Sequence, residues 1–321
     1  MGFSKWIAVA LGTAASVSAG YAAGGGDGPF DAGSTIIGHI ANNADNPIIR
    51  LPEVMGLDFS ITKHVFMVWL VAAIVFFGIS WIVRRRLKQG DTASFRPGTA
   101  LEMVVGYIRD SIVRPNVGDK WVNSWAPLIL TLFVFILAAN VIGLVPIFDV
   151  LHVVNHWTFH ADGSSAFGRL LEGGATATAN FNVTVGLALV TFFSIIIAGT
   201  KAHGFINHWK NLVPGGLAWP IYILLIPIEI MGMLIKPFAL TMRLAANMTG
   251  GHIAILAIIS LVFLLTELFN SALAGMLVGV VLSLPLALGI SGLELIVVLV
   301  QAYVFTLLTS VFIGMAINVH H

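Results

Sequence analysis

The sequence predicts an all-α protein that crosses a membrane several times. Of its 321 residues, 58% are hydrophobic and only 10% are charged, whereas a soluble domain has about 25% charged residues. The mean hydropathy is +0.95, and several charge-free runs reach the roughly 20 residues that a membrane-spanning helix needs. This composition excludes a soluble globular enzyme. It also excludes a disordered chain, because disorder requires low hydrophobicity and high net charge.

The N-terminal residues 1–23 have the pattern of a secretory signal peptide. Lys5 precedes an apolar run over residues 6–17, and small residues follow that run, as at a signal cleavage site. A retained first membrane helix is the alternative, although the run is shorter than a span. Residues 24–63 are Gly-rich and acidic, so we interpret them as an outward-facing polar segment ahead of the membrane domain, residues 64–319.

Three charge-free runs predict three membrane spans, at Val65–Val83, Trp125–Phe148 and Phe181–Thr200. Basic residues follow the first and the third run: Arg84, Arg85, Arg86 and Lys88, then Lys201, His203, His208 and Lys210. Positive charges collect on the cytoplasmic side of membrane proteins. We therefore expect both basic blocks inside, and the polar N-terminal segment and the loop 149–179 outside.

Two connecting segments carry patterns of their own. Between residues 90 and 120, apolar residues recur at the 3,4 spacing of an amphipathic helix (Leu101, Val104, Val105, Ile108 and Ile112). This helix would lie on the inner membrane surface or pack against protein. In the outer loop, His152, His156 and His160 recur every four residues and could line a metal site. No carboxylate continues that pattern, so a hydrated loop without metal is the expectation.

Residues 211–319 predict a hairpin of two long helices. This segment has five formal charges, with a predicted turn near Phe269, Asn270 and Ser271; the charged residues are Glu229, Lys236, Arg243, Glu267 and Glu294. Each helix would have roughly 45 residues, more than twice the length of a perpendicular crossing at 1.5 Å per residue. The helices must therefore be tilted or broken, and the prolines and glycines of this segment allow either. For Glu267, a position at an interface is the only role that the sequence suggests.

One face of the first long helix carries three charges. Glu229, Lys236 and Arg243 are spaced by seven residues, so each returns to within about 20° of the same face. Insertion of a charge costs roughly 2.5 to 3.5 kcal/mol, and membrane charges therefore usually mark an ion pathway. A structural ion pair between Glu229 and Lys236 is the alternative. Small residues follow Arg243, with Asn247 one turn away, so the guanidinium is expected to face a closely approaching partner.

A second set of polar residues can exchange protons. His252 lies nine residues beyond Arg243, on the opposite helical face and about 13 Å along the axis. Glu294 and Gln301 are seven residues apart on the last helix. Histidine titrates near neutral pH, and a carboxyl group in apolar surroundings can do so too. His252 and Glu294 on facing helices would therefore provide the minimum for a proton path.

At these residues the sequence resembles subunit a of the F-type ATP synthase. The resemblance is carried by Arg243–His252 (RLAANMTGGH) and Glu294–Phe305 (ELIVVLVQAYVF). It extends to Trp125–Pro146 with Asn140, and to the run Asn180-Phe-Asn182-Val-Thr, and so covers most of residues 58–319. Many bacterial relatives have Glu and His in the reverse order at positions 252 and 294, but the order found here is also known in the family. The N-terminal leader is not a general family feature.

The resemblance implies a bacterial Fo stator that forms two proton half-channels against the c-ring, separated by Arg243. It implies ion-translocation roles for Arg243, Asn247, His252, Glu294, Gln301, Glu229 and Lys236, and makes Asn140, Asn180 and Asn182 candidate channel-lining residues. The implied partners are the c-ring, the stalk subunit b, other synthase subunits and the lipid bilayer, with no nucleic acid and no cofactor. We expect no catalytic chemistry in this chain, and an inner-membrane location with the N-terminus outside and the C-terminus inside.

A self-contained secondary transporter is the main alternative function. Such transporters usually contain two repeated halves with matching broken helices. The sequence shows no such halves, and Arg243 is its only strong cation deep in an apolar segment. The choice between proton and sodium stays open at this level, because ion selectivity would reside mainly in the c subunit.

Overall fold

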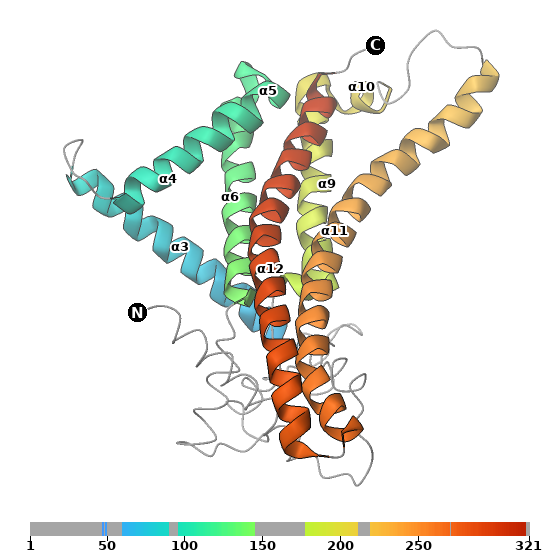
Figure 1. Cartoon of the computed structure of the whole chain (residues 1–321). Helices are drawn as coiled ribbons and strands as arrows, with labels where there is room; N and C mark the ends of the chain where they lie inside the picture. The colour runs from blue at the N-terminus through green and yellow to red at the C-terminus, as the bar shows by residue number, and fades with distance from the viewer. Residues whose placement is uncertain are drawn as a thin grey trace. The chain divides into compact units, whose positions relative to one another are not determined.

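The computed structural model describes residues 47, 49, 60–89, 96–144, 177–210, 219–269 and 271–318. The predicted signal peptide, most of the polar N-terminal segment and most of the loop 149–179 lie outside these residues. Within them the fold is helical, and the β pairing there is one isolated antiparallel bridge in which the Ile61 N–H donates to the Ile49 carbonyl at 2.9 Å. Among the described residues, five helices are long and apolar enough to cross a membrane, which confirms the predicted fold class (Figure 1).

The helices follow the predicted spans closely. Each predicted span begins inside one helix, since apolar runs of this length have no other way to satisfy their backbone hydrogen bonds in lipid. In chain order the elements are α3 (Lys63–Gln89), α4 (Arg96–Tyr107), the π-helix η1 (Ile108–Val113), α5 (Arg114–Val117), α6 (Asp119–Leu144), the 3₁₀ turn η2 (Ala177–Ala179), α9 (Phe181–His203), α10 (Phe205–Lys210), α11 (Trp219–Leu268) and α12 (Ala272–Ile317).

The last two helices form the predicted hairpin. Helix α11 has 50 residues and α12 has 46, and they meet at the predicted turn. Pro227, Pro237 and Pro285 lie inside these helices without ending them. The Thr241 hydroxyl donates to the Pro237 carbonyl at 3.0 Å, the back-bond to residue i−4 that threonine often forms inside a helix. Of the two alternatives, broken helices are therefore excluded, and the extra length must be accommodated by tilt or by extension beyond the hydrocarbon.

Contacts within the chain divide it into two compact units. The first, here called the turn unit, contains Ala139–Asn180 and the turn half of the hairpin, Ala246–Val297. The second, here called the core unit, contains Leu70–Ala138, Phe181–Ala245 and Val298–His321. In the turn unit α11 and α12 pack closely, since a Cβ atom added to Gly279 would come within 2.8 Å of the Val262 Cα.

Two apolar clusters hold the core unit together. One contains Ile112 of η1, Ile129 of α6 and Ile313 of α12, and the other contains Leu244 of α11 and Phe305 of α12, all almost fully buried. Helix α9 contributes to both clusters. It also contacts α12 through a polar pair, since the Thr191 and Thr309 hydroxyl oxygens lie 3.2 Å apart and both residues are completely buried. These helices run side by side in Figure 1.

The amphipathic helix predicted between residues 90 and 120 is present, and its C-terminal half packs against protein. Ile108 and Ile112 are each 1% exposed, whereas Val104 is 38% exposed. The sequence analysis did not predict that this half is a π-helix, η1. There the Ile112 carbonyl accepts hydrogen bonds from the Asn116 amide at 2.7 Å and from the Ser310 hydroxyl at 3.2 Å. The π-helix thus connects the surface segment to α12.

The C-terminal end of α12 is held by two neighbours. The Asn318 amide donates to the Asn116 carbonyl at 3.1 Å, and a His203 ring nitrogen lies 2.8 Å from the Ile317 carbonyl. Gly314 lies against the Asn116 backbone so closely that a Cβ atom there would overlap the carbonyl oxygen. Since the last carbonyls of a helix lack partners within it, the His203 ring supplies one for Ile317, and the Asn116 contacts fix the position of this end.

Candidate ion-translocation site

Arg243 and Asn247 lie on an exposed face of α11. Both side chains are exposed, whereas Leu240, Leu244 and Met248 on the other face are at most 1% exposed. The separation follows from the helical repeat, because residues four apart share a face. The positions around the arginine are also exposed, and most are small: Ala239, Met242, Ala246 and Gly250. The exposed face of α11 around the Arg243 guanidinium therefore consists mostly of small side chains.

The charge of Arg243 is not neutralised inside the part of the chain that the structure describes. No carboxylate among those residues forms an ion pair with it. An arginine guanidinium remains protonated in proteins. On a 50-residue apolar helix, such an exposed cation needs a partner surface or water, because lipid would not solvate it.

Glu229 and Lys236 are half-buried on the same helix. The Lys236 ammonium lies 5.5 Å from the centre of the Phe312 ring of α12, which is within the range of a cation–π interaction. Within the described residues no ion pair joins Glu229 to Lys236. Glu229 nevertheless attracts the Lys236 ammonium electrostatically, so the charge pair considered from the sequence stays a hypothesis, and the aromatic ring is a second partner of the ammonium.

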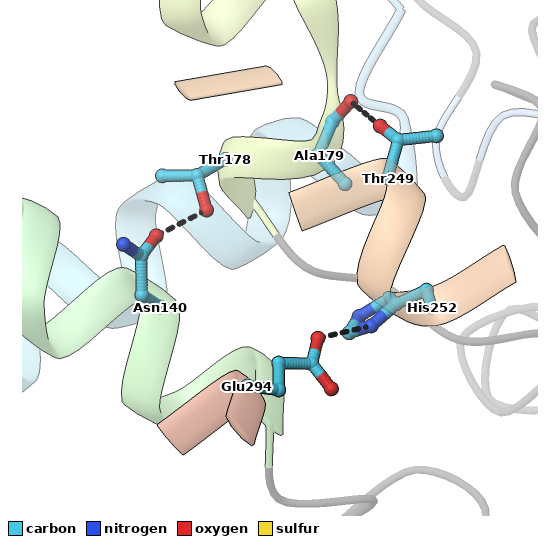
Figure 2. Close-up of polar contacts among 6 residues, drawn as sticks. All are labelled: Asn140, Thr178, Ala179, Thr249, His252 and Glu294. Atoms are coloured by element: carbon cyan, nitrogen blue, oxygen red, sulfur yellow. Dashed lines mark hydrogen bonds and ion pairs between the residues drawn. The ribbon is translucent and has the colours of Figure 1, made fainter. Parts of the chain in front are cut away.

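His252 and Glu294 are brought together in the turn unit. The His252 Nδ1 atom lies 3.1 Å from Glu294 Oε1. Figure 2 shows the two side chains pointing toward each other. The Glu294 side chain is 3% exposed and the His252 side chain 22%. Since α11 and α12 supply one residue each, the sequence spacing of 42 residues is bridged by the hairpin packing. A buried carboxyl group next to a partly accessible imidazole can pass a proton between them.

Gly251 permits this contact, and the sequence analysis missed it. A Cβ atom at position 251 would lie 2.6 Å from Glu294 Oε1 and 2.9 Å from its carboxyl carbon. The glycine therefore leaves the space that the carboxyl group occupies beside α11. The Gly250-Gly251 pair before His252 was the available signal, because adjacent glycines in a membrane helix indicate close approach of a neighbour.

Asn140, a candidate channel-lining residue, forms a second polar contact of the turn unit, with Thr178. The Thr178 hydroxyl donates to Asn140 Oδ1 at 2.6 Å, and both residues are completely buried. The Thr249 hydroxyl of α11 donates to the Ala179 carbonyl at 3.3 Å, so η2 is tied to both α6 and α11 (Figure 2). Thr178 and Thr249 were not singled out from the sequence, because isolated threonines carry no distinctive spacing.

Two of the predicted residues in this unit have a buried polar atom without a hydrogen-bond partner among the described residues. These atoms are Asn140 Nδ2 and Glu294 Oε2, and the Ser283 hydroxyl is a third such group in the unit. Buried polar atoms in native proteins are usually paired with protein or with ordered water. Unpaired atoms on two of the predicted residues therefore mark positions at which internal water would be bound.

The remaining predicted residues occupy different environments. Gln301 is 3% exposed in the core unit, Asn180 is half-buried, and Asn182 and Glu267 are exposed. No cluster of three metal-ligating residues occurs in the described ranges. The three loop histidines, at positions 152, 156 and 160, lie outside those ranges.

Comparison with known proteins identifies the family. The family model described as ATP synthase A chain matches residues 65–314. The chain is 37% identical to ATP synthase subunit a 2 of Chlorobium luteolum over 294 residues, which is 89% of this chain and 76% of that protein. It is 38% identical to ATP synthase subunit a of Myxococcus xanthus over 277 residues, or 85% and 78% of the two chains. With these matches and five helices suited to membrane spans, the chain belongs to the ATP synthase A chain family, the multi-pass membrane subunits a of ATP synthase.

Proposed function

We propose that this chain is the Fo stator subunit that forms two proton half-channels against a ring of c subunits, with Arg243 separating them. The observation that carries the proposal is the exposed, small-residue face of α11 around Arg243 and Asn247. Such a face allows another helix to approach closely. The c-ring supplies the carboxylate, while stalk subunit b and other synthase subunits hold the stator in place. The chain itself carries out no bond chemistry.

The fixed charge of Arg243 explains how ion flow drives rotation. A rotor carboxylate that arrives beside a guanidinium is favoured in its ionised form. It therefore releases its proton into one half-channel and takes up another only after it has passed to the second. The same positive charge repels protons from a direct path between the half-channels. Each translocated charge contributes about 2.3 kcal/mol per 100 mV of membrane potential.

The turn unit provides the residues of one half-channel. Glu294 and His252 exchange the proton, while Asn140 and Asn180 line the approach. Asn182, in the first turn of α9, is a further proposed channel-lining residue and belongs to the core unit. The buried, unpartnered atoms Asn140 Nδ2 and Glu294 Oε2 support a hydrated path here, because internal water molecules would satisfy such atoms. Lys236, Glu229 and Gln301 belong to the polar surface of the other half-channel.

Disulfide crosslinking tests whether the Arg243 face meets the rotor. The chain has no cysteines, so Ala246→Cys introduces a single one on the exposed face. We expect oxidation to crosslink it to a cysteine placed in the outer helix of the c subunit. Ala245→Cys is the matched control, because Ala245 is adjacent in sequence but only 8% exposed. Equal crosslinking by both variants, or by neither, would contradict the proposed interface.

The proposed topology places the basic blocks inside and the loop 149–179 outside, in a bacterial inner membrane. Single cysteines at Ser164 and Asn207 are expected to react with a membrane-impermeant thiol reagent from opposite sides. Right-side-out and inverted vesicles distinguish the two sides. Labelling of both cysteines from the same side would overturn the number of crossings between residues 125 and 200. In this topology residues 1–23 are cleaved as a signal peptide, and the N-terminus of the mature chain lies outside.

A further inference from the structure

Helix α10 exposes nearly all of its side chains. Phe205 is 63% exposed, Ile206 68% and Trp209 41%, and Asn207 and Lys210 are exposed as well. At about 100° per residue, the three apolar residues fall within an arc of roughly 100°, and Lys210 borders that arc. The Phe205 and Trp209 rings are stacked edge to face, with centroids 6.3 Å apart. Helix α10 thus exposes an apolar surface with the Lys210 ammonium beside it.

His208 sets this orientation. It is the buried residue of α10, with 7% exposure, and its ring lies directly on Gly199 of α9, where a Cβ atom would overlap it. Gly204 has φ +86°, a left-handed conformation that glycine adopts without strain, and it turns the chain between the two helices. Burial, and secondarily the nearby His203, lower the pKa of His208 from its usual 6.5. The inward ring is therefore uncharged at neutral pH, and the exposed charge resides on the lysines.

The surroundings of α10 are positively charged. Lys201 in the last turn of α9 is exposed, as is Lys210. The sequence contains no Asp or Glu between Glu172 and Glu229, and within the described residues neither lysine forms an ion pair. Helix α10 also follows the 23-residue apolar helix α9 after a single residue, which places it at the level where a span leaves the hydrocarbon. Aromatic residues with lysines at that level are typical of the membrane interface.

We propose that α10 and the end of α9 form a binding site for the headgroup phosphate of an anionic phospholipid. Lys201 and Lys210 provide the positive charge, and Phe205, Ile206 and Trp209 insert among the acyl chains. The charge complementarity selects anionic over zwitterionic lipid, because lysines near an anionic surface each contribute substantially to binding. The site depends on the membrane location of the chain and is independent of the role proposed for Arg243.

Fluorescence quenching in nanodiscs tests this site. Asn207→Cys is labelled with a small fluorophore in an assembled synthase whose other subunits carry no reactive cysteine. The nanodiscs contain either brominated phosphatidylglycerol in unlabelled phosphatidylcholine, or the reverse, at equal mole fraction. We expect stronger quenching by the brominated anionic lipid. Each lysine changes anionic-lipid affinity by roughly fivefold, so Lys201→Gln with Lys210→Gln should remove the difference while quenching by both lipids persists.

A matched control separates a local site from general attraction of charge. Lys120 is an exposed lysine on a tryptophan ring, 5.4 Å from the centre of the Trp121 ring. Lys120→Gln should leave the preference unchanged, and the same loss in this variant would overturn the site. Equal quenching by the two lipids in the unsubstituted chain would also overturn it. Absence of quenching by either lipid would show that another subunit covers α10. ATP-driven proton pumping, measured in parallel, reports separately on the proposed function.

Discussion

Replacement of Arg243 with alanine is expected to abolish ATP synthesis driven by an ion gradient while the chain still inserts into the membrane. Removal of a charge favours insertion by roughly 2.5 to 3.5 kcal/mol, so a loss of activity cannot be attributed to failed insertion. Leu240, Leu244 and the rest of the buried face of α11 are unaffected, because Arg243 is exposed on the other side. Gradient-driven ATP synthesis and ATP-driven proton pumping in inverted vesicles measure the effect.

Arg243→Lys is expected to fail almost as completely. An ammonium group can lose its proton when it is desolvated, and it lacks the planar fork with which a guanidinium pairs with a carboxylate. Arg109→Ala is the control, because Arg109 is an exposed arginine of η1 and has no proposed role in translocation. Normal pumping in either Arg243 variant would refute the role proposed for this residue, as would an equal loss in the Arg109 variant.

Removal of either member of the His252 and Glu294 pair is expected to reduce proton flux by about two to four orders of magnitude, since a positioned proton-transfer group contributes 10² to 10⁴ in rate. His252 Nδ1 and Glu294 Oε1 lie 3.1 Å apart. The losses of flux caused by His252→Ala and by Glu294→Ala should therefore not add in the double variant. An exchange that places Glu at 252 and His at 294 should be milder than the sum of the single changes. Flux is measured as the initial rate of pumping across a pH series.

Two further variants sharpen this test. Gly251→Ala keeps both titratable groups but places a Cβ atom 2.6 Å from the carboxylate oxygen, so flux should fall because the carboxyl group is displaced. Glu267→Ala removes an exposed carboxylate near the end of α11 and should leave flux unchanged. Strict additivity of the His252 and Glu294 changes would show that the two residues act separately, and full activity of the glycine variant would exclude a requirement for their contact.

The sequence by itself determined the five long apolar helices of the described residues and the exposed face of α11. An apolar run long enough to cross a bilayer must be helical there, because only a helix pairs all its backbone groups within one segment. The positions of the five long helices therefore follow from local composition. Regular spacing likewise separates Arg243 and Asn247 from Leu240 and Leu244, since the helical repeat is a property of a single element. These features require no knowledge of the other helices.

Only the tertiary structure decided which residues meet across helices. Gly251 leaves room for Glu294 to contact His252, which is 42 residues away in the sequence. Thr178 forms a hydrogen bond with Asn140, which is 38 residues away. Lys236 lies on the Phe312 ring of α12. The sequence did not predict the π-helix η1, because the spacing of its apolar residues also fits an α-helix. Each of these outcomes depends on how the packed helices are rotated and shifted along their axes. The interdigitation of side chains sets that arrangement, and the residue spacing within one helix does not contain it.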